Sequence, residues 1–96
     1  MANMIDPLEP EERAIWQVLL DAAPDDRMTT AELAATAAAL AHIPIPEWVV
    51  HEVTGLMVRC GYAIRVHVRR RRRTHLAWAY ALTMPGRARG TRLLAT

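Results

Sequence analysis

The chain contains no lysine, no serine, only one cysteine, and no acidic residue after Glu52. With Cys60 as its single cysteine, it cannot form an internal disulfide. No run of about 18 apolar residues occurs, so no membrane span is predicted. The first ten residues include Asp6 and Glu9 and lack the basic-then-apolar order of a signal peptide. These absences favour a protein of a reducing cytoplasm.

Residues that commonly carry catalysis or bind metal are also scarce. There is no serine nucleophile, no glycine-rich phosphate loop, and no carboxylate paired in sequence with a base. The cysteine and the four histidines lack the spacing of zinc ligands; they are His42, His51, Cys60, His67 and His75. We therefore expect no enzyme, no metal site and no cofactor, and we expect Cys60 to be a small buried packing residue.

Charge is divided sharply along the chain. All ten acidic residues lie within residues 1–52, where only Arg13 and Arg27 oppose them, so this part has a net charge of −8. Residues 53–96 contain ten arginines and no acid, a net charge of +10. Such asymmetry favours a polyanion partner for the basic part. The alternatives are attraction between the two parts of one chain, or head-to-tail pairing of two copies.

Two helices are predicted early in this small single domain. Residues 10–22 have Pro10 in the first helical turn and apolar residues at helical spacing after it. A second helix begins at Thr29, which stands three residues before Glu32 as a capping box requires. The residues expected on the buried faces are Ile15, Val18, Leu19, Ala22, Leu33, Ala37 and Leu40.

A third helix is predicted from about Pro46 to the residue before Gly61, because glycine readily takes the left-handed conformation that ends a helix. Its inward stripe is expected to contain Val50, Val53, Met57 and Cys60, with Thr54 at the edge. Its outward face is expected to present Trp48, His51, Glu52, Gly55 and Arg59.

After Gly61 the apolar period changes from that of a helix to that of a strand. Bulky residues alternate with others in two segments, 64–69 and 76–82, which predicts a pair of strands. Placing the bulky residues of both strands on one face pairs Val66 with Trp78 and Val68 with Leu76. That register leaves a connecting loop of odd length centred on Arg72.

Five consecutive arginines, 69–73, lie between these strands and concentrate positive charge at one end of the hairpin. Residues 84–96 read as a polar, basic tail that adds Arg87, Arg89 and Arg92. Leu93 and Leu94 would dock either on the body of the domain or on a second subunit.

The order helix, helix, turn, helix, strand, basic loop, strand resembles the winged helix-turn-helix of bacterial and phage transcription regulators. Four segments carry the resemblance: 29–34, 46–50, 60–63, and 80–83 followed by 85–87. It implies an α+β winged-helix fold, a three-helix bundle with a helix-turn-helix plus a C-terminal two-stranded β-hairpin wing. The chain would then divide into an N-terminal arm (1–9), the winged helix-turn-helix domain (10–84) and a basic C-terminal tail (85–96).

The same resemblance implies that the third helix lies near the major groove of DNA and that the wing contacts phosphates or the minor groove. We therefore expect a DNA-binding protein, a small transcription regulator or DNA-architectural factor, associated with the nucleoid in the cytoplasm. It would bind double-stranded DNA mainly through the arginine-rich wing, helped by the C-terminal arginines. The candidate DNA-binding residues are Arg69, Arg70, Arg71, Arg72, Arg73, Trp48, His51, Arg59, Arg65 and His67. For Trp48, a core or subunit contact is favoured over base stacking.

Two other functions stay open. The third helix begins with acidic residues, which favours the alternative of a protein–protein adaptor whose acidic N-terminal half docks a basic partner. RNA binding is a weaker third alternative, because the aromatic platforms typical of RNA readers are missing. A homodimer is also expected, since apolar residues fall outside the predicted core stripes at Trp16, Leu20, Leu56 and Val58.

Overall fold

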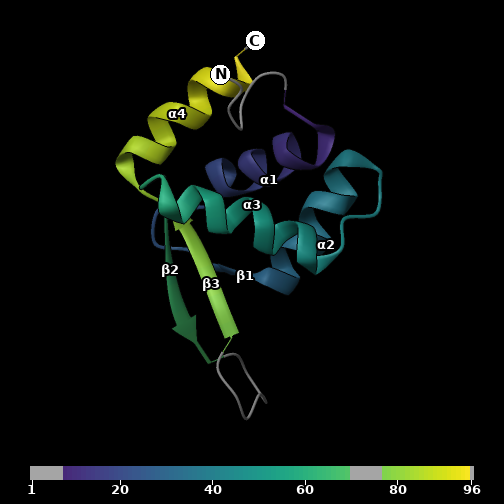
Figure 1. Cartoon of the computed structure of the whole chain (residues 1–96), viewed down its shortest axis with the longest axis horizontal. Helices are drawn as coiled ribbons and strands as arrows, with labels where there is room; N and C mark the ends of the chain where they lie inside the picture. The colour runs from purple at the N-terminus through teal and green to yellow at the C-terminus, as the bar shows by residue number, and fades with distance from the viewer. Residues whose placement is uncertain (1–7, 70–76, 96) are drawn as a thin grey trace.

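The computed structural model describes residues 8–69 and 77–95. Within them the chain forms an α+β domain of four helices and a three-stranded antiparallel sheet (Figure 1). The elements are α1 (Pro10–Asp21), β1 (Met28–Thr29), α2 (Thr30–Ala41), α3 (Glu47–Arg59), β2 (Ala63–Val68), β3 (Ala77–Leu82) and α4 (Met84–Leu94). The three predicted helices and the two predicted strands are confirmed, whereas β1 and α4 were not predicted.

The helix ends follow local sequence signals. At the start of α2, the backbone N–H of Thr29 donates to Glu32 Oε1 at 2.9 Å and that of Glu32 donates to Thr29 Oγ1 at 3.2 Å, so the predicted capping box is confirmed. After α3, Gly61 has a φ of 80°, the predicted left-handed conformation. These contacts satisfy backbone groups that a helix end leaves unpaired.

The core lies where α1, α2 and α3 meet one face of the sheet. Its largest fully buried side chains are Trp16, Tyr80, Ile15, Leu19, Leu33, Met57, Val50 and Thr54. Two predictions about the core are wrong. Leu40 is 49% exposed because it lies in the last turn of α2, at the rim of the contact with α1. Cys60 is exposed because it caps α3, where the chain turns towards β2.

The C-terminal segment forms helix α4, which corrects the predicted tail. Thr83 caps it by accepting a hydrogen bond from Gly86 N at 3.0 Å. The helix packs against α1, where a Cβ at Gly90 would lie 3.1 Å from Trp16 Cε3. Trp16 is therefore fully buried, although the sequence pattern placed it outside the core. Leu93 and Leu94 pack against the core of the same chain.

The sheet has the strand order β1-β3-β2, and its register corrects the predicted one. Val66 pairs with Ala79 and His67 pairs with Trp78, a shift of one residue. Because side chains alternate between faces, the shift moves every β3 side chain to the opposite face relative to β2. The last described pair is Val68 with Ala77, and the even number of residues between them means that the predicted odd-length loop is also wrong.

The observed register pairs large residues with small ones. The branched side chains of β2 lie opposite the alanines of β3: Ile64 with Ala81, Val66 with Ala79, and Val68 with Ala77. On the other face the bulky residues of β3 lie opposite Ala63, Arg65 and His67. Tyr80 and Leu82 can then enter the core, and both are buried.

Candidate nucleic-acid interface

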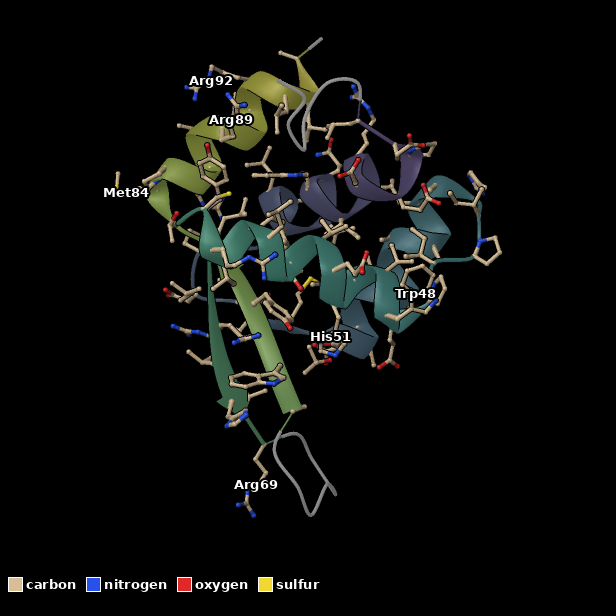
Figure 2. All side chains as sticks on the ribbon, in the orientation of Figure 1. Trp48, His51, Arg69, Met84, Arg89 and Arg92 are labelled. Carbon is tan, nitrogen blue, oxygen red and sulfur yellow. The ribbon has the colours of Figure 1, made fainter. Side chains whose placement is uncertain are left out.

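Two elements present the predicted site residues. Figure 1 shows α3 lying across the front of the helices, with the β2–β3 hairpin pointing away from them and α4 at the opposite end. Figure 2 shows Trp48 and His51 along α3 and Arg69 at the far end of β2. Trp48, His51 and Arg69 thus lie away from α4. Arg59 is in the last turn of α3, and the chain just after that helix is hydrogen-bonded to Thr83 at the start of α4.

The outward face of α3 carries the residues that the sequence placed there. Trp48, His51, Glu52 and Arg59 are exposed, and Gly55 is half-buried among them. Trp48 is 64% exposed, which excludes the core contact and leaves a subunit or ligand contact. A shallow hollow of about 370 Å³ opens on this face; its lining comprises His51, Glu52, Gly55, Leu56 and Arg59.

The hairpin carries a stack of three side chains that the predicted register did not contain. The guanidinium carbon of Arg65 lies 4.3 Å from the centre of the Trp78 ring. The ring centroids of His67 and Trp78 are 3.7 Å apart, with an interplanar angle of 33°. All three lie on one face of the hairpin, because His67 pairs directly with Trp78 and Arg65 is two residues earlier on β2.

This stack determines what each group can still bind. The Trp78 ring is contacted by both Arg65 and His67, so it supports both side chains. Stacking covers the flat face of a guanidinium but leaves its in-plane N–H donors available. Arg65 can therefore present donors to an anion such as phosphate from a fixed position.

The arginine run is described only at its first member. Arg69 directly follows β2 and is exposed. The other four, Arg70, Arg71, Arg72 and Arg73, lie outside the described residues. Arg65, His67 and Arg69 are alternate residues of one strand and its extension, so they form a row that leads towards the run.

The C-terminal arginines do not belong to this surface, contrary to the prediction that they assist the hairpin. Figure 2 shows Arg89 and Arg92 on α4, at the end of the domain opposite Arg69. Arg87 is used within the fold, since its guanidinium donates to the carbonyl oxygens of Leu20 and Ala22. Helix α4 is therefore part of the scaffold rather than a second basic arm beside α3.

Sequence reasoning missed Trp78 as a site residue. Trp78 lies on the same face as Tyr80 and Leu82 in either register, but the predicted register puts Ile64, Val66 and Val68 on that face in place of Arg65 and His67. The alternation of large and small residues was nevertheless a usable signal. The alanines of β3 leave room for the branched residues of β2, and pairing them in this way places Trp78 beside His67.

The described residues contain neither a cluster of metal ligands nor a membrane-spanning helix. Over residues 8–69 and 77–95, no three residues among histidine, cysteine, aspartate and glutamate come together as metal ligands would. No helix in those ranges has the length and apolar character needed to cross a membrane.

Similarity to known proteins is confined to the fold. No protein-family model matches the chain. No curated protein sequence matches it either. The crystal structure of the circadian clock associated protein Pex from Anabaena is similar, with a TM-score of 0.69 and 12% sequence identity over 92% of this chain and 76% of that chain. The chain therefore shares its fold with that clock-associated protein.

Proposed function

We propose that this chain is a winged-helix DNA-binding protein, a small transcription regulator or DNA-architectural factor. Helix α3 is the helix that approaches the major groove, and the β2–β3 hairpin is the wing, which supplies most of the binding free energy. Double-stranded DNA is the partner, and no enzymatic activity or cofactor is part of the proposal.

The observation that carries the proposal is the row of cationic and stacking groups on the wing. Arg65 is held 4.3 Å from the Trp78 ring, and Arg69 follows at the end of the strand. A fixed guanidinium loses less conformational freedom when it binds a phosphate than a free one does. The four arginines that follow Arg69 in sequence add further charge at this end of the hairpin. A concentrated row of this kind suits the phosphates or the minor groove of a duplex.

The overall fold gives separate support. The likeness to the Anabaena protein extends over 92% of this chain, and the described part has the helix and strand order expected of a winged helix. The Anabaena protein is associated with the circadian clock, which agrees with a regulatory role for proteins of this shape. At 12% identity the likeness supports the fold, and the DNA-binding role rests on the wing.

The salt dependence of DNA binding tests the proposal. If four or five wing arginines neutralise phosphates, the logarithm of the association constant should fall with the logarithm of salt concentration at a slope of about −4. Replacing Arg71, Arg72 and Arg73 with glutamine should weaken binding to every duplex and reduce the slope by about 3. The matched single variants are Arg69→Gln on the wing and Arg92→Gln on α4, and only the first should reduce the slope by about 1. An unchanged slope in the triple variant would contradict the wing as the main contact.

A protein adaptor is the second candidate, and one feature favours it. A hollow of about 660 Å³ between α1 and α2 has three carboxylates, Asp21, Asp26 and Glu32, and one guanidinium, Arg27, in its lining, so its net charge is negative. A basic segment of a partner protein would fit an acidic hollow of this size. A gel shift with random-sequence duplex at about 100 mM salt separates the two functions, because the adaptor predicts no shift.

We also propose that the protein forms a homodimer. Trp48 supports this, since a largely exposed tryptophan is common at protein interfaces. Of the residues from which the sequence predicts an interface, Trp16 is buried by α4, whereas Leu20 and Val58 are only half-buried. Sedimentation at tens of micromolar protein tests the dimer.

A further inference from the structure

Gly55 occupies an unusual place for a glycine. It lies inside α3, away from both ends, on the face that points to solvent. Glycine is among the least favourable residues in a helix interior, because its backbone loses the most freedom on folding. A glycine at such a position therefore calls for a reason beyond helix formation.

Packing within the described residues does not supply that reason. A Cβ built at Gly55 would meet only one atom within 4 Å, the Arg59 Nη1 of a flexible side chain at 3.9 Å. Gly86 and Gly90 on α4 differ, because a Cβ there would overlap the backbone of Tyr62 or crowd the ring of Trp16. Gly61 differs as well, because its φ of 80° favours glycine. Because Gly55 has no side chain, an open hollow remains at this point of α3. The hollow allows a group from outside the chain to approach the helix backbone closely.

The groups around the hollow indicate what approaches. His51 lies one turn before Gly55, and Arg59 lies one turn after it. Glu52 also lines the hollow, so a carboxylate acceptor stands near a guanidinium donor. Neither Glu52 nor Arg59 has a side-chain partner among the residues that the structure describes. A phosphate would be repelled by Glu52, whereas a neutral base edge with both donors and acceptors would suit this mixed lining.

The major-groove edge of a G·C base pair has that combination. Guanine presents the acceptors O6 and N7, which arginine commonly contacts, and cytosine presents the N4 amino donor, which glutamate can accept. Leu56 supplies an apolar wall, and the bare backbone at Gly55 lets the edge of the pair come close to the helix. The negative charge of Glu52 opposes contact with phosphate, but the same carboxylate can accept a hydrogen bond from cytosine.

We propose that the hollow at Gly55 reads a G·C base pair in the major groove, with Arg59 donating to guanine and Glu52 accepting from cytosine. This inference rests on the proposed function, because it needs the wing to hold the duplex against α3. It adds a base preference to a contact that the wing alone would make with any sequence.

Fluorescence anisotropy with labelled duplexes tests the inference. The probes are two short duplexes of equal length, one of alternating G and C and one of alternating A and T, at the same salt concentration. The wild-type chain should bind the G·C duplex about 10-fold more tightly. A third duplex, with 7-deazaguanine in place of guanine, removes N7 while keeping the helix, O6 and the cytosine amino group, and it should lose part of that preference.

Two variants and a control test whether the hollow makes the base-specific contact. Gly55→Gln fills the hollow with a residue that favours helix, so the fold should be kept or stabilised. Its affinity for the G·C duplex should fall to or below that for the A·T duplex, and its affinity for the A·T duplex should not fall, because glutamine can pair with adenine. Glu52→Gln should lower the preference in part. Ala88→Gln, at an exposed position on α4, is the matched control and should behave as wild type.

The outcomes separate this inference from the proposed function. Equal binding of both unmodified duplexes by the wild-type chain would overturn the reading of G·C pairs and leave the wing proposal standing. A G·C preference that survives in Gly55→Gln would show that another surface makes the distinction, which also overturns it. Binding to none of the duplexes would overturn both proposals together.

Discussion

Arg87 on α4 caps the end of α1 through Ala22, sixty-five positions earlier in the chain. Its Nη2 donates to the carbonyl oxygen of Ala22 at 2.8 Å, and its Nη1 donates to that of Leu20 at 3.1 Å. Helix α1 has no basic residue in its own last turn, so its negative end would otherwise lack a cation. The charge that the sequence assigned to a DNA-binding tail is therefore used to join two helices.

Removing this cap should destabilise the fold without affecting the wing. We expect Arg87→Met to lower the free energy of unfolding by about 2 kcal/mol, because two charged hydrogen bonds to partly buried carbonyls are lost. Urea denaturation measures the change. Arg92→Met, at an exposed position on the same helix, is the control and should change stability by less than about 0.5 kcal/mol. Equal stabilities of the two variants would contradict a capping role for Arg87.

Two glycine-to-alanine changes should move stability in opposite directions. In Gly86→Ala the new Cβ would overlap the backbone carbonyl of Tyr62, which cannot move aside as a side chain could. We expect a loss of about 3 kcal/mol or more, measured by thermal unfolding. Gly55→Ala places its methyl group in open space on a helix and should gain about 0.5–1 kcal/mol. A loss of stability in Gly55→Ala would mean that packing does require this glycine.

Trp78 should contribute to DNA binding through Arg65. Trp78→Ala removes the ring that holds the guanidinium, so it should weaken binding although the protein keeps all of its charges. In a double-mutant cycle with Arg65→Ala, the coupling energy for DNA binding should be about 0.5–1 kcal/mol. Trp78→Phe keeps an aromatic face and should restore part of the affinity. Strict additivity of the two alanine variants would show that the stack does not position Arg65.

Trp48 provides the test of self-association. If it lies in a subunit interface, Trp48→Gln should shift sedimentation equilibrium towards the monomer while unfolding stability stays about the same, since the side chain is 64% exposed in the single chain. A wild-type protein that sediments as a monomer at tens of micromolar would remove the proposed dimer. In that case Trp48 would stay available for contact with DNA.

Features set by near neighbours were predictable. The capping box of Thr29 and Glu32, the first turn at Pro10 and the left-handed Gly61 each depend on residues within one turn of each other, and all three were predicted. The outward placement of His51 and Arg59 was predictable for a similar reason, because the helical period alone assigns them to a face.

Features set by distant contacts were not predictable in this way. Helix α4 contains Gly86 and Gly90, which disfavour a helix, and its formation depends on their close approach to Tyr62 and Trp16. A hydroxyl cap at Thr83 and the proline after it were local signals for this helix, but the polar, basic composition outweighed them. Once α4 is in place, it explains the burial of Trp16 and the use of Arg87.

By itself the sequence determined the α+β class, the helix ends, the two strands of the hairpin and the separation of charge, because each depends on local conformation or composition. The tertiary structure decided the strand register and the packing of the last helix, because both depend on which volumes fit together across the core. Ala79 opposite Val66 and His67 opposite Trp78 are outcomes of that fit, and they place Arg65 on the ring of Trp78. The sequence thus located the basic surface, and packing between distant residues decided how its side chains are held.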